Sequence, residues 1–307
     1  MNGAEPKIEI FKPFGEAFEL MKRILFQPFE LKKWLVIGFA AFLAHLGAGF
    51  NFNYNYGDRS QLPQELSDAF HQIPLWIIVV GATFGIVLII TIAVVFAWLR
   101  ARGRFIFIDC IVKNRAAIVQ PWREFREQGT SYFLFSLLIG CSFFLFAALL
   151  SLPFLLPIVR GVTFPHLHDV YLISVIVLWA VVIFLLVFAW ALVAHLMVAI
   201  MYRRRCRVCE AFSVVVSLIA AYPGEIVLYC LFWVVLGLGS IMVSCITICA
   251  TCCIAAIPYV GTVILLPVFV VLRSFSLCFL RQFGSDYDVW ATLPQPEAPA
   301  IPPPLPA

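Results

Sequence analysis

The residues best suited to chemistry in this sequence are cysteines that gather near position 250. Cys249, Cys252 and Cys253 have the spacing of a CxxC pair with a third thiol, and Cys245 lies one helical turn before Cys249. Thiolates placed in this way could bind Cu(I) or cycle as a disulfide in an oxidising compartment. No charged residue is near to lower a thiol pKa, and cysteine also packs well as a small apolar side chain. We therefore favour packing and keep a thiol or copper protein as an alternative.

Two other groups have ligand residue types but incomplete sites. Cys206 and Cys209 form half of a zinc site, and no second pair is spaced to complete a tetrahedron. His166 and His168, beside Asp169, could hold a metal, although an exposed loop explains them as well. The sequence therefore predicts no metal and no cofactor.

Two histidines lie within the long apolar runs, His45 in the first and His195 near the end of the fourth. An ionisable residue inside a membrane span is the usual pointer to a transport path, but no acidic or basic residue falls in the middle of these runs. We expect each histidine to hydrogen-bond a neighbouring helix. Phosphate-binding glycine loops, serine-hydrolase elbows and HExxH patterns are absent from the sequence as well, so we predict that the protein is not an enzyme.

The apolar runs that carry these residues set the fold class. The chain is 63% hydrophobic and 12% charged, with a mean hydropathy of +0.99, whereas soluble domains are roughly a quarter charged. From Glu225 to Leu272 there is no further charge until Arg273. A membrane helix needs about 20 apolar residues, so this stretch is long enough for two spans. The sequence predicts an all-α, multi-pass integral membrane protein.

The apolar runs divide the chain into six predicted spans and a tail. The spans lie at about 34–50, 75–99, 131–159, 170–202, 226–248 and 254–272. Together they form one membrane domain over residues 1–290, and the proline-rich segment 291–307 is predicted to be a disordered tail. Gly81 and Gly85, four residues apart in the second span, would let a neighbouring helix approach closely.

Amphipathic segments between the spans are predicted to lie as helices on the membrane surface. They are found before the first span, at residues 62–73, and from Glu210 to Ala221. The longest polar gap, Arg100 to Thr130, is expected to fold onto the surface as one or two helices broken at Pro121.

The basic residues give the orientation. Of the 21 lysines and arginines, all except Arg59 and Arg160 fall on the side of the N-terminus. The positive-inside rule then places both termini in the cytoplasm, in an inner membrane. The most concentrated cluster is predicted to contact anionic lipid headgroups, or simply to orient the helix that precedes it. It comprises Arg203, Arg204, Arg205 and Arg207.

Several short motifs resemble a family of uncharacterised multi-pass bacterial and archaeal membrane proteins. They are Phe14-Gly-Glu-Ala-Phe18 before Lys33-Trp34, Arg104-Phe-Ile-Phe-Ile-Asp109 before Pro121-Trp122-Arg123, and Phe279-Leu-Arg-Gln-Phe-Gly284 before Tyr287. The resemblance implies a prokaryotic inner-membrane protein and provides no catalytic or binding residues.

These observations lead to one favoured function and two alternatives. We favour a non-enzymatic role in organising the membrane or envelope through contacts with membrane lipids or a membrane-protein partner. The first alternative is an uncoupled transporter or channel for a small or lipidic solute, suggested by prolines in the third and sixth spans. The second is the thiol or copper protein described above. Basic charge placed between apolar runs suits lipid headgroups, so nucleic acid is not an expected partner.

Overall fold

The computed structural model describes residues 9–46, 74–159, 167–251 and 254–291. The regular elements in this part of the chain are all helices, with no strand, as the sequence predicts. The long helices are α4 (Leu75–Val112), α6 (Arg126–Val159), α7 (Leu167–Arg204) and α9 (Pro223–Ala250). The shorter ones are α1 (Phe11–Leu25), α2 (Leu31–His45), α5 (Val119–Glu124), α8 (Val208–Ala221), η2 (Ile254–Ala256), α10 (Pro258–Ile264) and α11 (Leu266–Arg281).

Four helices, α4, α6, α7 and α9, are long and apolar enough to cross a membrane, and a bent pair provides a fifth candidate span. The pair is α10 and α11, which meet at an angle of 66°. The described part of the predicted first span is α2, which has 15 residues, and residues 47–50 lie outside the described ranges. The described residues thus support a multi-pass membrane protein with four or five candidate spans, and a sixth stays a prediction.

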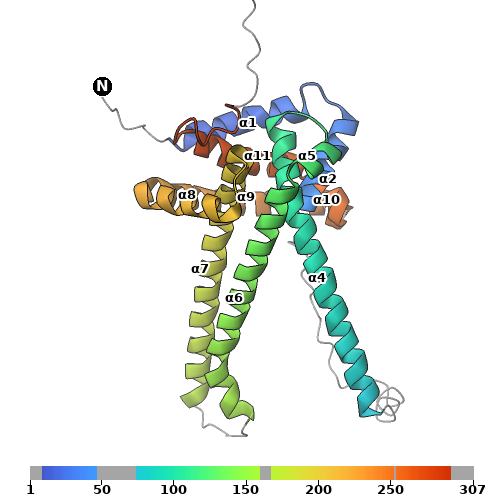
Figure 1. The fold of residues 1–307 in the computed structure, drawn as a ribbon, viewed down its shortest axis with the longest axis vertical. Helices are drawn as coiled ribbons and strands as arrows, with labels where there is room; N and C mark the ends of the chain where they lie inside the picture. The colour runs from blue at the N-terminus through green and yellow to red at the C-terminus, as the bar shows by residue number, and fades with distance from the viewer. Residues whose placement is uncertain (1–8, 47–73, 160–166, 252–253, 292–307) are drawn as a thin grey trace, which may run out of the picture.

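The molecule divides into a packed cap and three apolar arms (Figure 1). The arms are residues 75–95 of α4, 137–149 of α6 and 173–190 of α7, in which most large apolar side chains are exposed. The arms of α6 and α7 run side by side, while that of α4 diverges from them (Figure 1). The cap contains the opposite ends of these helices with α1, α2, α5, α8, α10 and α11. A helix that is apolar on all sides suits an apolar surrounding, which is what a membrane provides.

The prediction that the polar gap after Leu99 lies on the membrane surface is wrong. Helix α4 continues without a break to Val112, and residues 105–112 are almost completely buried in the cap. The run Phe105-Ile-Phe-Ile108 explains this, because four consecutive large apolar residues are best accommodated inside a packed core. Gly103 makes the close packing of α2 possible, since a Cβ atom there would lie 2.6 Å from the backbone of Leu43 and Ala44.

The first predicted surface helix is α1, and its apolar face is covered by the protein itself. Ala17, Met21, Ile24 and Leu25 are buried, and α1 packs along α11. The two ends of the described chain are also joined, because the Glu9 amide and carbonyl exchange hydrogen bonds of 2.8 Å with the side chain of Gln282. Both ends of the membrane domain therefore lie in the cap.

Candidate functional site

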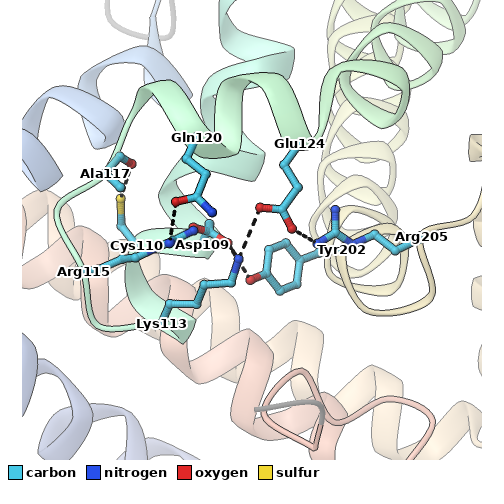
Figure 2. A network of polar contacts seen from close by, with 9 residues as sticks. All are labelled: Asp109, Cys110, Lys113, Arg115, Ala117, Gln120, Glu124, Tyr202 and Arg205. Carbon is cyan, nitrogen blue, oxygen red and sulfur yellow. Dashed lines mark hydrogen bonds and ion pairs between the residues drawn. The ribbon is translucent and has the colours of Figure 1, made fainter. Parts of the chain in front are cut away.

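Two clusters of charged side chains lie in or beside the cap, and the first is centred on Asp109. This carboxylate has no exposed side-chain area. It accepts a 2.9 Å hydrogen bond from the Tyr202 hydroxyl and a 2.6 Å contact from Lys113 Nζ. Arg115 adds bonds of 3.2 Å from Nε and 2.9 Å from Nη2. Figure 2 shows these donors converging on Asp109 from α4, α7 and the loop after α4.

Glu124 extends this cluster toward the end of α7. It forms ion pairs with Lys113, at 3.4 Å, and with Arg205, while Gln120 accepts a 2.8 Å bond from Arg115 (Figure 2). Burial alone would raise the pKa of Glu124, but hydrogen bonds and charges from Arg205 and Lys113 lower it overall. The pKa of Arg115 is raised, chiefly by its hydrogen bond to Asp109.

The Asp109 cluster is chemically saturated. Each carboxylate is paired with cations, and four donor atoms already occupy Asp109. A general acid or base must be able to reach its substrate with a free lone pair or proton. Because the contacts of Asp109 and Glu124 are already made within the protein, the cluster is a clamp that joins α4, α5 and α7.

The second cluster surrounds an internal cavity of about 220 Å³. Two guanidiniums and two imidazoles line it, and the other walls are apolar. The lining residues are Ala44, His45, Arg104, Phe107, His195, Trp233, Phe269, Leu272 and Arg273.

Arg273 is the most deeply placed charge of the cavity, with 7% of its surface exposed. Its Nη1 atom donates to His195 Nδ1 at 3.0 Å and to the His195 carbonyl at 3.3 Å. Since arginine can only donate, His195 Nδ1 must be the acceptor, so the proton of the neutral ring lies on Nε2. The buried Nη2 atom of Arg273 and the buried Nε1 atom of Trp233 have no hydrogen-bond partner among the described residues. The cavity wall therefore holds two unpaired donors.

Arg104 lines this cavity and a larger groove beside it. The groove has a volume of about 820 Å³ and lies between α4, α6 and α7, at the level where the arms leave the cap. Arg104 donates to the Tyr132 hydroxyl, and Arg100 and Ser136 line the same groove. In the described ranges, no carboxylate oxygen lies within 4 Å of the charged nitrogens of Arg100, Arg104 or Arg273. Unlike the Asp109 cluster, this region has basic groups without acidic partners.

The predicted histidine contacts are half right. His195 hydrogen-bonds Arg273 on the neighbouring helix α11, as expected. His45 instead contacts the Ala41 carbonyl of its own helix at 2.8 Å, and its ring lies 4.5 Å from that of Phe269. The sequence gave no reason to expect both rings in one cavity.

Three of the four arginines predicted to contact lipid headgroups bind protein groups. Arg203 donates to the Ser285 carbonyl at 3.3 Å, and Arg204 lies 3.6 Å from Asp286. Arg205 pairs with Glu124 in the clamp, while Arg207 is exposed at the start of α8. Headgroup contact by these four residues stays a prediction.

The structure brings no partners to the other predicted sites. A Cβ atom added at Gly81 or Gly85 would meet no described atom within 4 Å, so helix packing there stays a prediction. Cys245 and Cys249 are exposed free thiols, while Cys252 and Cys253 lie outside the described ranges. Across the residues with described positions, no three metal-ligating side chains gather.

The sequence reasoning missed Arg104 and Arg273 as functional residues. Arg273 marks the end of the sixth predicted span, and Arg104 falls in the predicted surface gap. The one available signal was their setting, since each is a single basic residue followed by apolar or small residues in a helix that continues.

Comparison with known proteins adds a family and no activity. A family model described as a family of unknown function, DUF7544, matches residues 9–285. No curated protein and no solved structure matches the chain significantly. The matched region covers most of the chain, which therefore belongs to this family.

Proposed function

We propose that this member of the DUF7544 family is a non-enzymatic protein of a prokaryotic inner membrane that organises the membrane by holding a lipid in the groove beside Arg104. In this proposal the chain crosses the bilayer six times, with α2 and the α10–α11 pair contributing to the first and last crossings. The cap and both termini lie in the cytoplasm. The packing of α1 on α11 supports termini on a common side, and the distribution of lysine and arginine supports the cytoplasmic side.

The groove is the single observation that carries the proposal. Residues 75–99 of α4 extend roughly 37 Å at 1.5 Å per residue, slightly more than the about 30 Å of a bilayer's hydrocarbon core. Arg100 then lies at the depth of the lipid headgroups, with Arg104 one turn further into the cap. Below them the groove is lined by apolar residues of α6 and α7, such as Leu137, Phe144 and Val187. An acyl chain fits the apolar part, and an anionic headgroup fits the basic end.

A second role, as an uncoupled transporter of a lipidic solute, is favoured by one feature. The 66° break between α10 and α11 resembles the discontinuous helices that transporters place at their binding sites. Leu272 and Arg273 of α11 line the internal cavity, so the broken pair contributes directly to that wall. Flux of a labelled lipid across proteoliposomes would support this role, and binding without flux favours the organising role.

The proposal is tested by filling the groove. A Cβ atom at Gly140 meets no atom within 4 Å, and Gly140 lines the groove, so Gly140→Phe occupies the groove without displacing the backbone. Gly237 on α9 is equally open and lies outside the groove, so Gly237→Phe is the matched control.

Lipid retention is measured by native mass spectrometry after release from nanodiscs. We expect the wild type and Gly237→Phe to keep one lipid and Gly140→Phe to keep about tenfold less, since one unit of tenfold corresponds to the 1.4 kcal/mol that a blocked apolar contact of this size can remove. Equal retention by all three proteins would exclude the groove as the lipid site.

A further inference from the structure

We propose that the cavity between Arg104, Trp233 and Arg273 is a binding site for a phosphate monoester group, which deepens and rests on the proposed lipid-holding function. The shared chemistry is a terminal phosphate, whose source is either the headgroup of a lipid such as phosphatidic acid or free inorganic phosphate.

The first argument is the kind of polar group left unpaired. Arg273 Nη2 and Trp233 Nε1 are buried, have no described partner, and belong to side chains that line the cavity. Both groups can only donate hydrogen bonds, and His195 Nε2 provides a third donor because its Nδ1 accepts from Arg273. Buried donors without acceptors are costly in a folded protein, so the wall is complementary to a ligand rich in acceptors.

The second argument is charge. Arg104 and Arg273 line one cavity of apolar walls, and neither has a described carboxylate within 4 Å. Two cations that share a poorly screened space repel each other, and an anion between them offsets that repulsion. A phosphate monoester carries up to two negative charges and matches both guanidiniums, whereas a carboxylate or phosphodiester carries one.

The third argument is size and access. A volume of about 220 Å³ is smaller than the about 300–1,000 Å³ of sites that enclose drug-sized ligands. It accommodates a phosphate and excludes a sugar headgroup. Arg104 lines both the cavity and the groove, so a lipid lying in the groove has its headgroup next to the cavity.

The rings beside the donors hold the site in place. The His195 ring lies 5.3 Å from that of Trp233, and the His45 ring packs against Phe269. These contacts keep the imidazoles and the indole oriented in the absence of ligand. A preorganised site loses less conformational freedom when it binds, which strengthens affinity.

The test uses two conservative variants and two controls in the full chain. Trp233→Phe removes one donor and keeps the ring, and Arg273→Lys keeps the charge and removes the forked geometry. Trp179→Phe, on the arm of α7, and Arg123→Gln, on the exposed face of α5, change the same residue types away from the cavity. Circular dichroism and thermal unfolding confirm that each variant folds, and the Trp233→Phe variant keeps the test valid if Arg273→Lys does not.

Three probes are compared in nanodiscs of phosphatidylcholine: added phosphatidic acid, added phosphatidylglycerol, and inorganic phosphate alone. We expect phosphatidic acid to be retained in preference to phosphatidylglycerol. Loss of one hydrogen bond to a charged group should weaken binding by about tenfold or more in Trp233→Phe and Arg273→Lys, with the controls unchanged. Binding of inorganic phosphate that the same variants weaken also supports the site and identifies the soluble source.

Two results would overturn the inference. One is phosphate or phosphatidic acid binding that is equal in the wild type and the cavity variants, and the other is no binding of either probe. If lipids are retained without headgroup preference and Gly140→Phe still releases them, the groove proposal stands and the phosphate site fails. If phosphate binds and the cavity variants weaken it while Gly140→Phe changes nothing, the phosphate site stands and the groove proposal fails.

Discussion

The Asp109 clamp and the Arg104–Arg273 cavity are two charge clusters of the same protein with opposite completeness. In the clamp, Asp109 and Glu124 are matched by Lys113, Arg115 and Arg205, and the donors of Asp109 come from within the chain. In the cavity, two guanidiniums share one space without an acid. A buried ion pair that is fully matched holds helices together, whereas unmatched donors are useful only when something else binds them. The difference separates a structural cluster from a binding site more clearly than residue type does.

The sharpest way to break this comparison is to remove one charge from each cluster. Asp109→Asn leaves Lys113 and Arg115 without their buried partner, and removal of one member of such a pair costs about 3–5 kcal/mol of folding free energy. Arg104→Gln relieves repulsion and loses the bond to Tyr132, so its cost should be no more than about 1 kcal/mol. Thermal or denaturant unfolding in detergent micelles measures both.

The matched control is Asp286→Asn. Asp286 is 78% exposed and pairs with Arg204 at 3.6 Å, so its replacement should change stability by less than about 1 kcal/mol. If Arg104→Gln is the more destabilising change, the cavity is the structural cluster and the comparison is reversed.

The next largest effect concerns the packing that creates the cavity wall. Gly103→Val places methyl groups against the backbone of Leu43 and Ala44, which a side-chain rotation cannot relieve. Overpacking of this kind costs about 1–3 kcal/mol or more. It should also push α2, with Ala44 and His45, away from the cavity, so phosphate binding should fall together with stability.

Gly81→Val is the control on the same helix, because a Cβ atom there meets no described atom within 4 Å. Its unfolding midpoint should match the wild type, and size-exclusion chromatography with light scattering reports whether a second copy packs there. If Gly103→Val unfolds like Gly81→Val, the close approach of α2 to α4 is not the contact that holds the cap.

The sequence was sufficient for the helices and insufficient for the site, for a physical reason. Helices α6, α7 and α9 follow from local hydropathy, which needs no knowledge of neighbours. The burial of Asp109 depends on Tyr202, which is 93 residues away, and the Arg273–His195 bond joins residues 78 apart. Local patterns also end the second span at Arg100, because they do not reveal that α2 covers the remainder of α4. The distance between interacting residues therefore marks where prediction from sequence stops.

The smallest predicted effect tests how far the clamp depends on ionised Glu124. The pKa of this carboxyl is lower in the folded protein than its usual 4.5, in spite of burial, because Arg205 and Lys113 stabilise the charged form. Its contribution to stability is therefore complete above pH 4.5 and is lost as the pH falls through the lowered value in the folded state. Its side chain is 31% exposed, so we expect at most about 1 kcal/mol after solvent screening.

Unfolding of the wild type and of Glu124→Gln should be compared between pH 6 and the acid limit of about 3 at which carboxyls of usual pKa are protonated. Above pH 4.5 the wild type should be the more stable, and the two curves should converge as the acid is protonated. Binding of phosphatidic acid by Glu124→Gln at pH 6 should equal that of the wild type, because Glu124 does not line the cavity. Loss of that binding together with the clamp would mean that the two clusters act as one unit, in which a complete structural cluster holds the incomplete one in its binding geometry.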